Sequence, residues 1–156
     1  MFTGEYRHTI DDKNRLAIPA PIRDSIDINV DGKGFYITRG LDTCLFMYTT
    51  NMWEKVLSKK MEKLSFTGKM ARNFQRTFFS NASKITDCDQ QGRILLPQKL
   101  KEIAKINKNV VIVGVNKRIE IWDEKMWNDV ETENEKEFEK VAEELFQSGF
   151  FSSETD

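Results

Sequence analysis

Apolar and polar positions alternate in several short stretches of this chain, and this alternation predicts β-strands. Residues 16–18 and 94–96 read apolar–other–apolar, and each stretch lies between a turn-forming segment and a proline. Such alternation buries one set of side chains and leaves the other set on the opposite face of the strand. Further strands are predicted at 6–10, 34–40, 44–49, 83–88, 110–115 and 118–123.

Helical patterns fill the segments between these strands. Pro19 and Pro97 end two of the strands and favour the start of short helices at 19–26 and 97–104. The segment 54–80 spaces its apolar residues three or four positions apart, which predicts a helical connector.

Residues 129–151 predict an acidic amphipathic helix. Its apolar side is formed by Val130, Phe138, Val141, Leu145 and Phe146. The simplest expectation is that this side packs on the protein's own body. The alternatives are a contact with another copy of the chain and an acidic decoy that competes with DNA.

The chain contains an internal repeat. The phrase DDKNRLAIP at 11–19 recurs as DQQGRILLP at 89–97, and the strands that follow each phrase also correspond. The offset between the copies is 78 residues at the phrase and 74 further on, so the second copy is four residues shorter. The turn-rich loop 28–34 is the expected place for this difference, because loop length changes at little cost.

Each copy has the predicted order β–turn–β–α–β–β, with the phrase forming a hairpin turn. A unit this small leaves strand edges unpaired and buries little core, so the two copies are expected to pair. The fold class is therefore mainly β with short helices. The predicted parts are a first unit at 5–53, the connector at 54–80, a second unit at 81–127, and an acidic helix and tail at 128–156.

Composition and charge narrow the class of protein. Of the 156 residues, 39% are hydrophobic and 31% charged, which is typical of a globular protein and not of a disordered one. The apolar runs are too short to span a membrane and no signal region is evident, so a cytoplasmic protein is expected. The net charge of −1 hides a basic body, because 12 of 25 acidic residues but only 3 of 24 basic residues follow Trp122.

The reactive side chains argue against an enzyme or a metal protein. Cys44 and Cys88 lack metal-ligand spacing and are expected to be buried thiols, and His8 is the single histidine. Neither a catalytic triad nor a glycine-rich phosphate loop is evident. Asp11 and Asp12 stand beside cationic residues, which disfavours the raised pKa that a general acid needs. No metal or cofactor is predicted.

In both phrases an aspartate stands four residues before an arginine, while the residues between them change. Asn14 and Gly92 precede the arginines, and these residue types best adopt positive φ, which indicates a tight turn. One interpretation is a surface salt bridge that contributes about 0–1 kcal/mol. The other is that the arginine fork is presented to phosphate or guanine while the aspartate holds it in position.

Four segments carry a resemblance to a known family. They read GEYRHTIDDKNRLAIPAPIR, RGLDTCLFMY, FQRTFFSNASKITDCDQQGRILLPQKLK and VVIVGVNKRIEIWDEKMW. In this order and spacing they resemble the MraZ family of bacterial transcriptional regulators, which has two tandem domains of the AbrB type. The likeness runs from Met1 to about Trp127. It departs from the family at Asn14, where glycine is usual.

The resemblance implies a β-barrel-like core of two intertwined copies, a ring of several chains and location on the nucleoid. It implies a repressor that binds direct repeats in promoter DNA ahead of the division and cell-wall gene cluster. The turn residues that it assigns to DNA contact are Asp11, Lys13, Asn14, Arg15, Asp89, Gln91, Gly92 and Arg93.

Other interpretations stay open. Arg23 and Lys101 are candidates for phosphate contacts, or they cap their own short helices. An AbrB-type antidote or protein-interaction module is the alternative function, and a small toxin gene beside this gene would support it. A purely structural oligomer predicts that Arg15 and Arg93 can be replaced without loss of binding.

Overall fold

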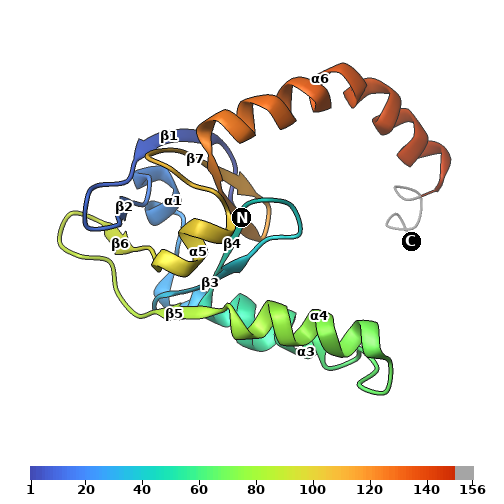
Figure 1. Ribbon diagram of the computed structural model, residues 1–156, viewed down its shortest axis with the longest axis horizontal. Helices are drawn as coiled ribbons and strands as arrows, with labels where there is room; N and C mark the ends of the chain where they lie inside the picture. The colour runs from blue at the N-terminus through green and yellow to red at the C-terminus, as the bar shows by residue number, and fades with distance from the viewer. Residues whose placement is uncertain (150–156) are drawn as a thin grey trace. The chain divides into compact units, whose positions relative to one another are not determined.

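The computed structural model describes residues 1–149, so the predicted helix end and tail at 150–156 lie outside the described residues. The chain divides into two compact units, Met1–Glu124 and the residues from Lys125 onward. The first unit contains both copies of the repeat. Figure 1 shows its strands and short helices together with the helices of the connector.

Six strands of the first unit form one antiparallel sheet in the order β1-β7-β8-β4-β3-β5. The strands are β1 (Glu5–Thr9), β3 (Phe35–Arg39), β4 (Leu45–Thr49), β5 (Ser83–Ile85), β7 (Asn109–Val115) and β8 (Arg118–Asp123). The leading strand of each copy pairs with the other copy, because β1 lies beside β7 and β5 lies beside β3. This exchange confirms the prediction of two intertwined copies. The sheet ends at β1 and β5, so among the described residues it is not closed into a barrel.

Two short strands, β2 (Arg15–Ala17) and β6 (Arg93–Leu95), form a second sheet of their own. They pair antiparallel, with Leu16 opposite Ile94. The predicted hairpin is therefore wrong in its partner, because β2 leaves the turn to pair with its counterpart from the other copy. Local sequence predicts the turn, but the partner of the strand depends on contacts about 80 residues away.

The pairing registers relate the two copies by an approximate two-fold symmetry. On the large sheet Leu45 lies opposite Ile121 and Met47 lies opposite Ile119. The repeat aligns Leu45 with Ile119 and Met47 with Ile121, so the first pair becomes the second when the copies are exchanged. The β2–β6 pair obeys the same rule, as expected of a self-complementary contact.

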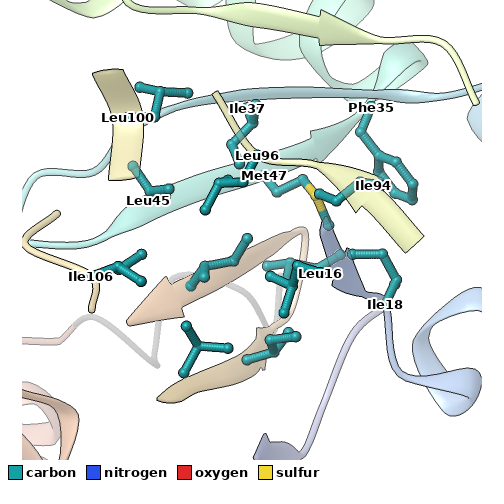
Figure 2. Close-up of a cluster of buried hydrophobic side chains, with 14 of the residues drawn as sticks. Leu16, Ile18, Phe35, Ile37, Leu45, Met47, Ile94, Leu96, Leu100 and Ile106 are labelled. Atoms are coloured by element: carbon teal, nitrogen blue, oxygen red, sulfur yellow. The ribbon is translucent and has the colours of Figure 1, made fainter. Parts of the chain in front are cut away.

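The core lies between the β2–β6 pair and the large sheet (Figure 2). Four apolar side chains of the repeated phrase are at most 1% exposed: Leu16, Ile18, Ile94 and Leu96. Leu95, between two of them, is 64% exposed, which confirms the alternation that the sequence predicts. Cys44 is buried as expected, whereas Cys88 is only half-buried, and both are free thiols.

The short helices follow the two prolines. They are α1 (Ala20–Asp24) and α5 (Gln98–Ile103), and each starts directly after its proline. The loop predicted to contain the four extra residues of the first copy includes a single helical turn, α2 (Ile28–Asp31). The side chain of Asp27 accepts a hydrogen bond from the Asn29 N–H and so caps this turn.

The connector is helical, as predicted, but it begins with a π-helix. Its elements are η1 (Met52–Leu57), α3 (Ser58–Met61) and α4 (Lys69–Ser80). Trp53 of η1 stacks between Tyr36 of β3 and Phe78 of α4, with ring centroids 5.0 and 5.6 Å apart. These aromatic contacts hold the connector against the sheet.

The C-terminal helix α6 spans Glu124–Gln147 and starts five residues earlier than predicted. It follows β8 without a break. Glu124 of its first turn is 3.4 Å from Arg7 of β1 and so belongs to the first unit. No helix within residues 1–149 combines the length and the apolar character that crossing a membrane would require.

Candidate nucleic-acid interface

The first Asp–Arg turn is built around the carboxylate of Asp11. Its Oδ1 accepts hydrogen bonds from the backbone N–H groups of Lys13 and Arg15, each at 2.9 Å. Its Oδ2 accepts a 2.7 Å bond from Nε of Arg15. The N–H of Asn14 donates to the backbone carbonyl of Asp11 at 3.0 Å. One aspartate therefore fixes both the turn and the arginine side chain.

The second turn repeats this geometry. Asp89 Oδ1 accepts from the N–H groups of Gln91 and Arg93 at 2.9 Å, and Oδ2 accepts from Nε of Arg93 at 2.8 Å. The N–H of Gly92 donates to the Asp89 carbonyl at 3.0 Å. The repeat conserves these residues because each makes several of the bonds that define the turn.

The residue before each arginine adopts the predicted left-handed conformation. Asn14 has a φ of 61° and Gly92 has a φ of 74°. Other residues adopt this conformation at a cost of about 1–2 kcal/mol. Asparagine and glycine are therefore interchangeable as far as the backbone is concerned.

The same hydrogen bonds keep the carboxylates ionised. The bond from the backbone N–H of Arg15 is the largest influence that lowers the pKa of Asp11 below its ordinary value, and the guanidinium adds to it. The backbone N–H of Arg93 lowers the pKa of Asp89 in the same way. An ionised carboxylate can accept hydrogen bonds and so orient an arginine, but it has no proton to donate.

The β2–β6 pair joins the two turns, and residues 11–15 and 89–93 are together called the paired turns below. Ile18 N–H donates to the Gly92 carbonyl at 2.9 Å, and Leu96 N–H donates to the Asn14 carbonyl at 2.8 Å. Arg93 Nη1 lies 3.6 Å from Asp11 Oδ2, so this aspartate faces the arginines of both turns. The structure thus brings together all eight residues predicted from the sequence.

The two arginines are less exposed than the alternation suggests. The side chain of Arg15 is 36% exposed and that of Arg93 is 25% exposed. Each guanidinium is fixed through Nε, and Nη1 of Arg93 also faces Asp11. The other Nη groups supply the donors that remain for a ligand. A donor group that is already immobilised loses less entropy when it binds.

Charge is balanced within the paired turns. Residues 11–15 hold two acidic and two basic residues, and residues 89–93 hold one of each. Lys13 and Gln91 occupy equivalent, exposed positions, where the turn uses only their backbone N–H groups. Attraction of an anion to this surface therefore depends on directed donors and on basic residues around the turns.

Sequence reasoning did not find the contacts that cross between the copies. Lys101 Nζ donates to Asn14 Oδ1 at 3.1 Å, and Asn14 Nδ2 donates to Gln98 Oε1 at 2.9 Å. Arg23 Nε donates to the Ile18 carbonyl of its own copy at 3.0 Å, and its guanidinium lies against Gly92 of the other copy. These bonds do not go to the carbonyls at the helix ends, although Arg23 and Lys101 both lie in the last turns of α1 and α5, as the helix-capping alternative expects. The equivalence of Arg23 and Lys101 in the repeat was the available signal, but it does not reveal their partners.

Comparison with known families agrees with the repeat. Residues 1–77 and residues 78–149 each match the model of the MraZ family, which is described as "MraZ protein, putative antitoxin-like". The two matches meet within α4 and together cover all the residues that the structure describes.

Proposed function

The chain belongs to the MraZ family, and from this premise we propose that it is a transcriptional regulator that binds promoter DNA through its paired turns. In this proposal it represses by binding direct repeats ahead of the division and cell-wall gene cluster, on the nucleoid. Asp11 and Asp89 orient the arginines. Arg15 and Arg93 donate to base edges or phosphates.

The observation that supports this function is the doubled geometry of the Asp–Arg turn. Both arginines are held by Nε–carboxylate bonds of 2.7 and 2.8 Å, and in the β2–β6 pair Arg15 lies opposite Leu95 while Arg93 lies opposite Ala17. The second copy reproduces each backbone bond of the first, so both turns hold their arginine in the same way. Nη1 of Arg93 also lies 3.6 Å from Asp11, and the remaining Nη donors of the two oriented guanidinium groups suit guanine or phosphate oxygens.

Several chains are proposed to act together in a ring. Two arginines from one chain give a small footprint, and the paired turns have no excess positive charge to add affinity. Repetition of the pair by cyclic symmetry multiplies the contacts and makes binding depend on the spacing of the DNA repeats.

A binding assay with the region upstream of the protein's own gene tests the proposal. Arg15→Ala and Arg93→Ala should each cost about 1–3 kcal/mol, a loss of roughly fivefold to 150-fold in affinity. Arg76→Ala is the matched control, because Arg76 lies exposed on α4 and its Nη1 donates to Asn73 of the same helix. It should retain affinity.

Light scattering on the same samples tests the assembly. The arginine variants should keep the size of the wild-type oligomer, because the turns are proposed to contact DNA and not the neighbouring chain. Unaltered DNA affinity in both arginine variants would overturn the role of the turns. A monomer at the concentrations that bind DNA would overturn the multivalent mechanism.

The family description favours a second candidate, an antidote that binds a partner protein. Two copies of the unit on one chain argue against it, because such antidotes usually carry one copy and a toxin-binding extension. The gene neighbourhood separates the two functions. Cell-wall synthesis genes downstream fit a regulator of that cluster, whereas a small toxin gene alongside fits an antidote.

A further inference from the structure

Two basic side chains reach from a helix of one copy to the turn of the other. Lys101 of α5, in the second copy, donates Nζ to the side-chain oxygen of Asn14 in the first turn at 3.1 Å. Arg23 of α1, in the first copy, lies against Gly92 of the second turn. The repeat aligns Arg23 with Lys101, so the two contacts are related by the approximate two-fold symmetry.

Each basic side chain matches the turn residue that it meets. Both polar atoms of the Asn14 amide form hydrogen bonds: Oδ1 accepts from Lys101 and Nδ2 donates to Gln98. A Cβ atom added to Gly92 would lie only 2.7 Å from Cζ of Arg23 and 2.8 Å from its Nε. In the second turn the guanidinium therefore occupies the space that a side chain would need.

Arg23 also links its own strand to the opposite turn. Its Nε donates to the carbonyl of Ile18, and the N–H of Ile18 donates to the carbonyl of Gly92. The guanidinium thus packs on the residue whose backbone continues directly into Arg93. Lys101 has the same relation to Arg15, because it holds Asn14, the residue immediately before it.

We propose that Lys101 and Arg23 are positioning residues, each of which holds the turn of the opposite copy so that its arginine is aimed at DNA. This inference rests on the proposed function. Asn14 and Lys101 form one matched pair, and Gly92 and Arg23 form the other. Replacing one residue of a pair without the other therefore disturbs the turn. The two turns are therefore coupled to the opposite helices, and neither copy presents its arginine unaided.

A phosphate contact is the competing role for Lys101, and salt dependence distinguishes the two. A lysine that neutralises a phosphate changes the slope of log affinity against log salt by about 0.9. A positioning residue changes affinity and leaves this slope unaltered. Lys101 is only partly exposed, and its Nζ is already bound to the Asn14 amide, which favours positioning.

The experiment measures affinity for the upstream DNA over a series of salt concentrations. Lys101→Met keeps the stem and removes the donor, and it should weaken binding about tenfold with the slope unchanged. Lys101→Arg, which keeps a donor, should retain most of the affinity. Lys99→Met removes an equal charge from an exposed position of the same helix and should not reproduce the tenfold loss.

A double variant identifies the contact that matters. Asn14→Gly should weaken binding at least as much as Lys101→Met, because it also removes the bond to Gln98. The combined variant should be no weaker than Asn14→Gly alone, because both single changes remove the Lys101–Asn14 contact. Effects that multiply, or a slope that falls by about 0.9 in Lys101→Met, would overturn the inference in favour of a phosphate contact. Thermal unfolding of each variant verifies that the protein is folded.

The second turn provides an independent arm. Gly92→Asn should weaken binding because its side chain meets Arg23, and addition of Arg23→Lys should recover part of the loss by recreating the pairing of the first turn. Recovery should be partial, because Ala20 stands where the other copy has Gln98. No recovery would contradict the matched pairs.

These results separate the inference from the function on which it rests. If wild-type protein does not bind the DNA, or Arg15→Ala binds as well as wild type, the proposed function and the inference both fail. If Arg15→Ala loses binding while Lys101→Met and Gly92→Asn do not, only the inference fails.

Discussion

Neighbouring residues on β6 provide a test of how the two turns are joined. Ile94 is 1% exposed and lies opposite Leu16 in the β2–β6 pair, whereas Leu95 is 64% exposed and lies opposite Arg15. Ile94→Ala and Leu95→Ala remove apolar atoms from adjacent positions of one strand. Only the first removes them from the core that the two copies share.

The expected magnitudes follow from burial. Ile94→Ala deletes three carbon atoms, worth about 0.8 kcal/mol each on transfer, and leaves a cavity, so the total loss is about 2–5 kcal/mol. Leu95→Ala should change the free energy of unfolding by about 0.5 kcal/mol or less. Since a native domain is stable by only about 5–15 kcal/mol, the first change is large and the second is small.

Chemical denaturation followed by the fluorescence of the three tryptophans measures both variants. All samples should share one protomer concentration, because assembly adds to apparent stability. Ile94→Ala should move the midpoint and leave the denaturant slope unchanged. If both variants lost the same free energy of unfolding, or if Ile94→Ala lost less than about 1 kcal/mol, the placement of the core between the β2–β6 pair and the large sheet would be refuted.

Two further predictions concern pH and a buried carboxylate. Because hydrogen bonds lower the pKa values of Asp11 and Asp89 below the ordinary 3.8, their stabilisation is present above that pH and is lost as pH falls through the lowered values. Acid unfolding curves of wild type and of an Asp11→Asn/Asp89→Asn variant should therefore differ above about pH 4 and converge below it, and a difference independent of pH would contradict this. Glu120 is 7% exposed and accepts bonds from Arg118 Nε and Trp122 Nε1 at 2.8 and 2.9 Å. Glu120→Ala should lower the free energy of unfolding by about 1–3 kcal/mol, measured by thermal or chemical unfolding. Glu62→Ala, at an exposed position, is the control and should change it very little. Equal effects of the two variants would refute the role of these bonds.

The elements of the first unit were predictable because their signals are local. Alternation, the two prolines and the asparagine and glycine before the arginines determine strands, helix starts and turns within a few residues. The positive φ of Asn14 and the burial of Leu16 and Ile94 followed from these patterns. The carboxylate-to-arginine bonds also lie within five residues, so the repeated phrase was enough to predict them.

Partners distant in sequence were not predictable in the same way. The phrase predicts that β2 exists but not that it pairs with β6, because its three residues offer no pattern that distinguishes β1 from β6 as a neighbour. The contact of Lys101 with Asn14 spans 87 residues, and either residue alone has an ordinary local interpretation. The four-residue difference between the copies was visible in the sequence, but the helical turn α2 within this loop depends on the cap at Asp27.

The approximate two-fold symmetry within one chain bears on the kind of DNA site that the proposed function requires. A perfectly symmetric pair of turns would present the same donors in both directions, which suits inverted half-sites. Direct repeats all point in one direction along the DNA. A chain that distinguishes this direction therefore needs two turns that differ from each other. The differences between Lys13 and Gln91, and between Asn14 and Gly92, supply this inequality while the Asp–Arg bonds stay the same. Cyclic symmetry would then repeat one directional pair from chain to chain. A variant in which the two turns have the same sequence should therefore lose its preference for direct over inverted repeats, whereas its DNA affinity should change less.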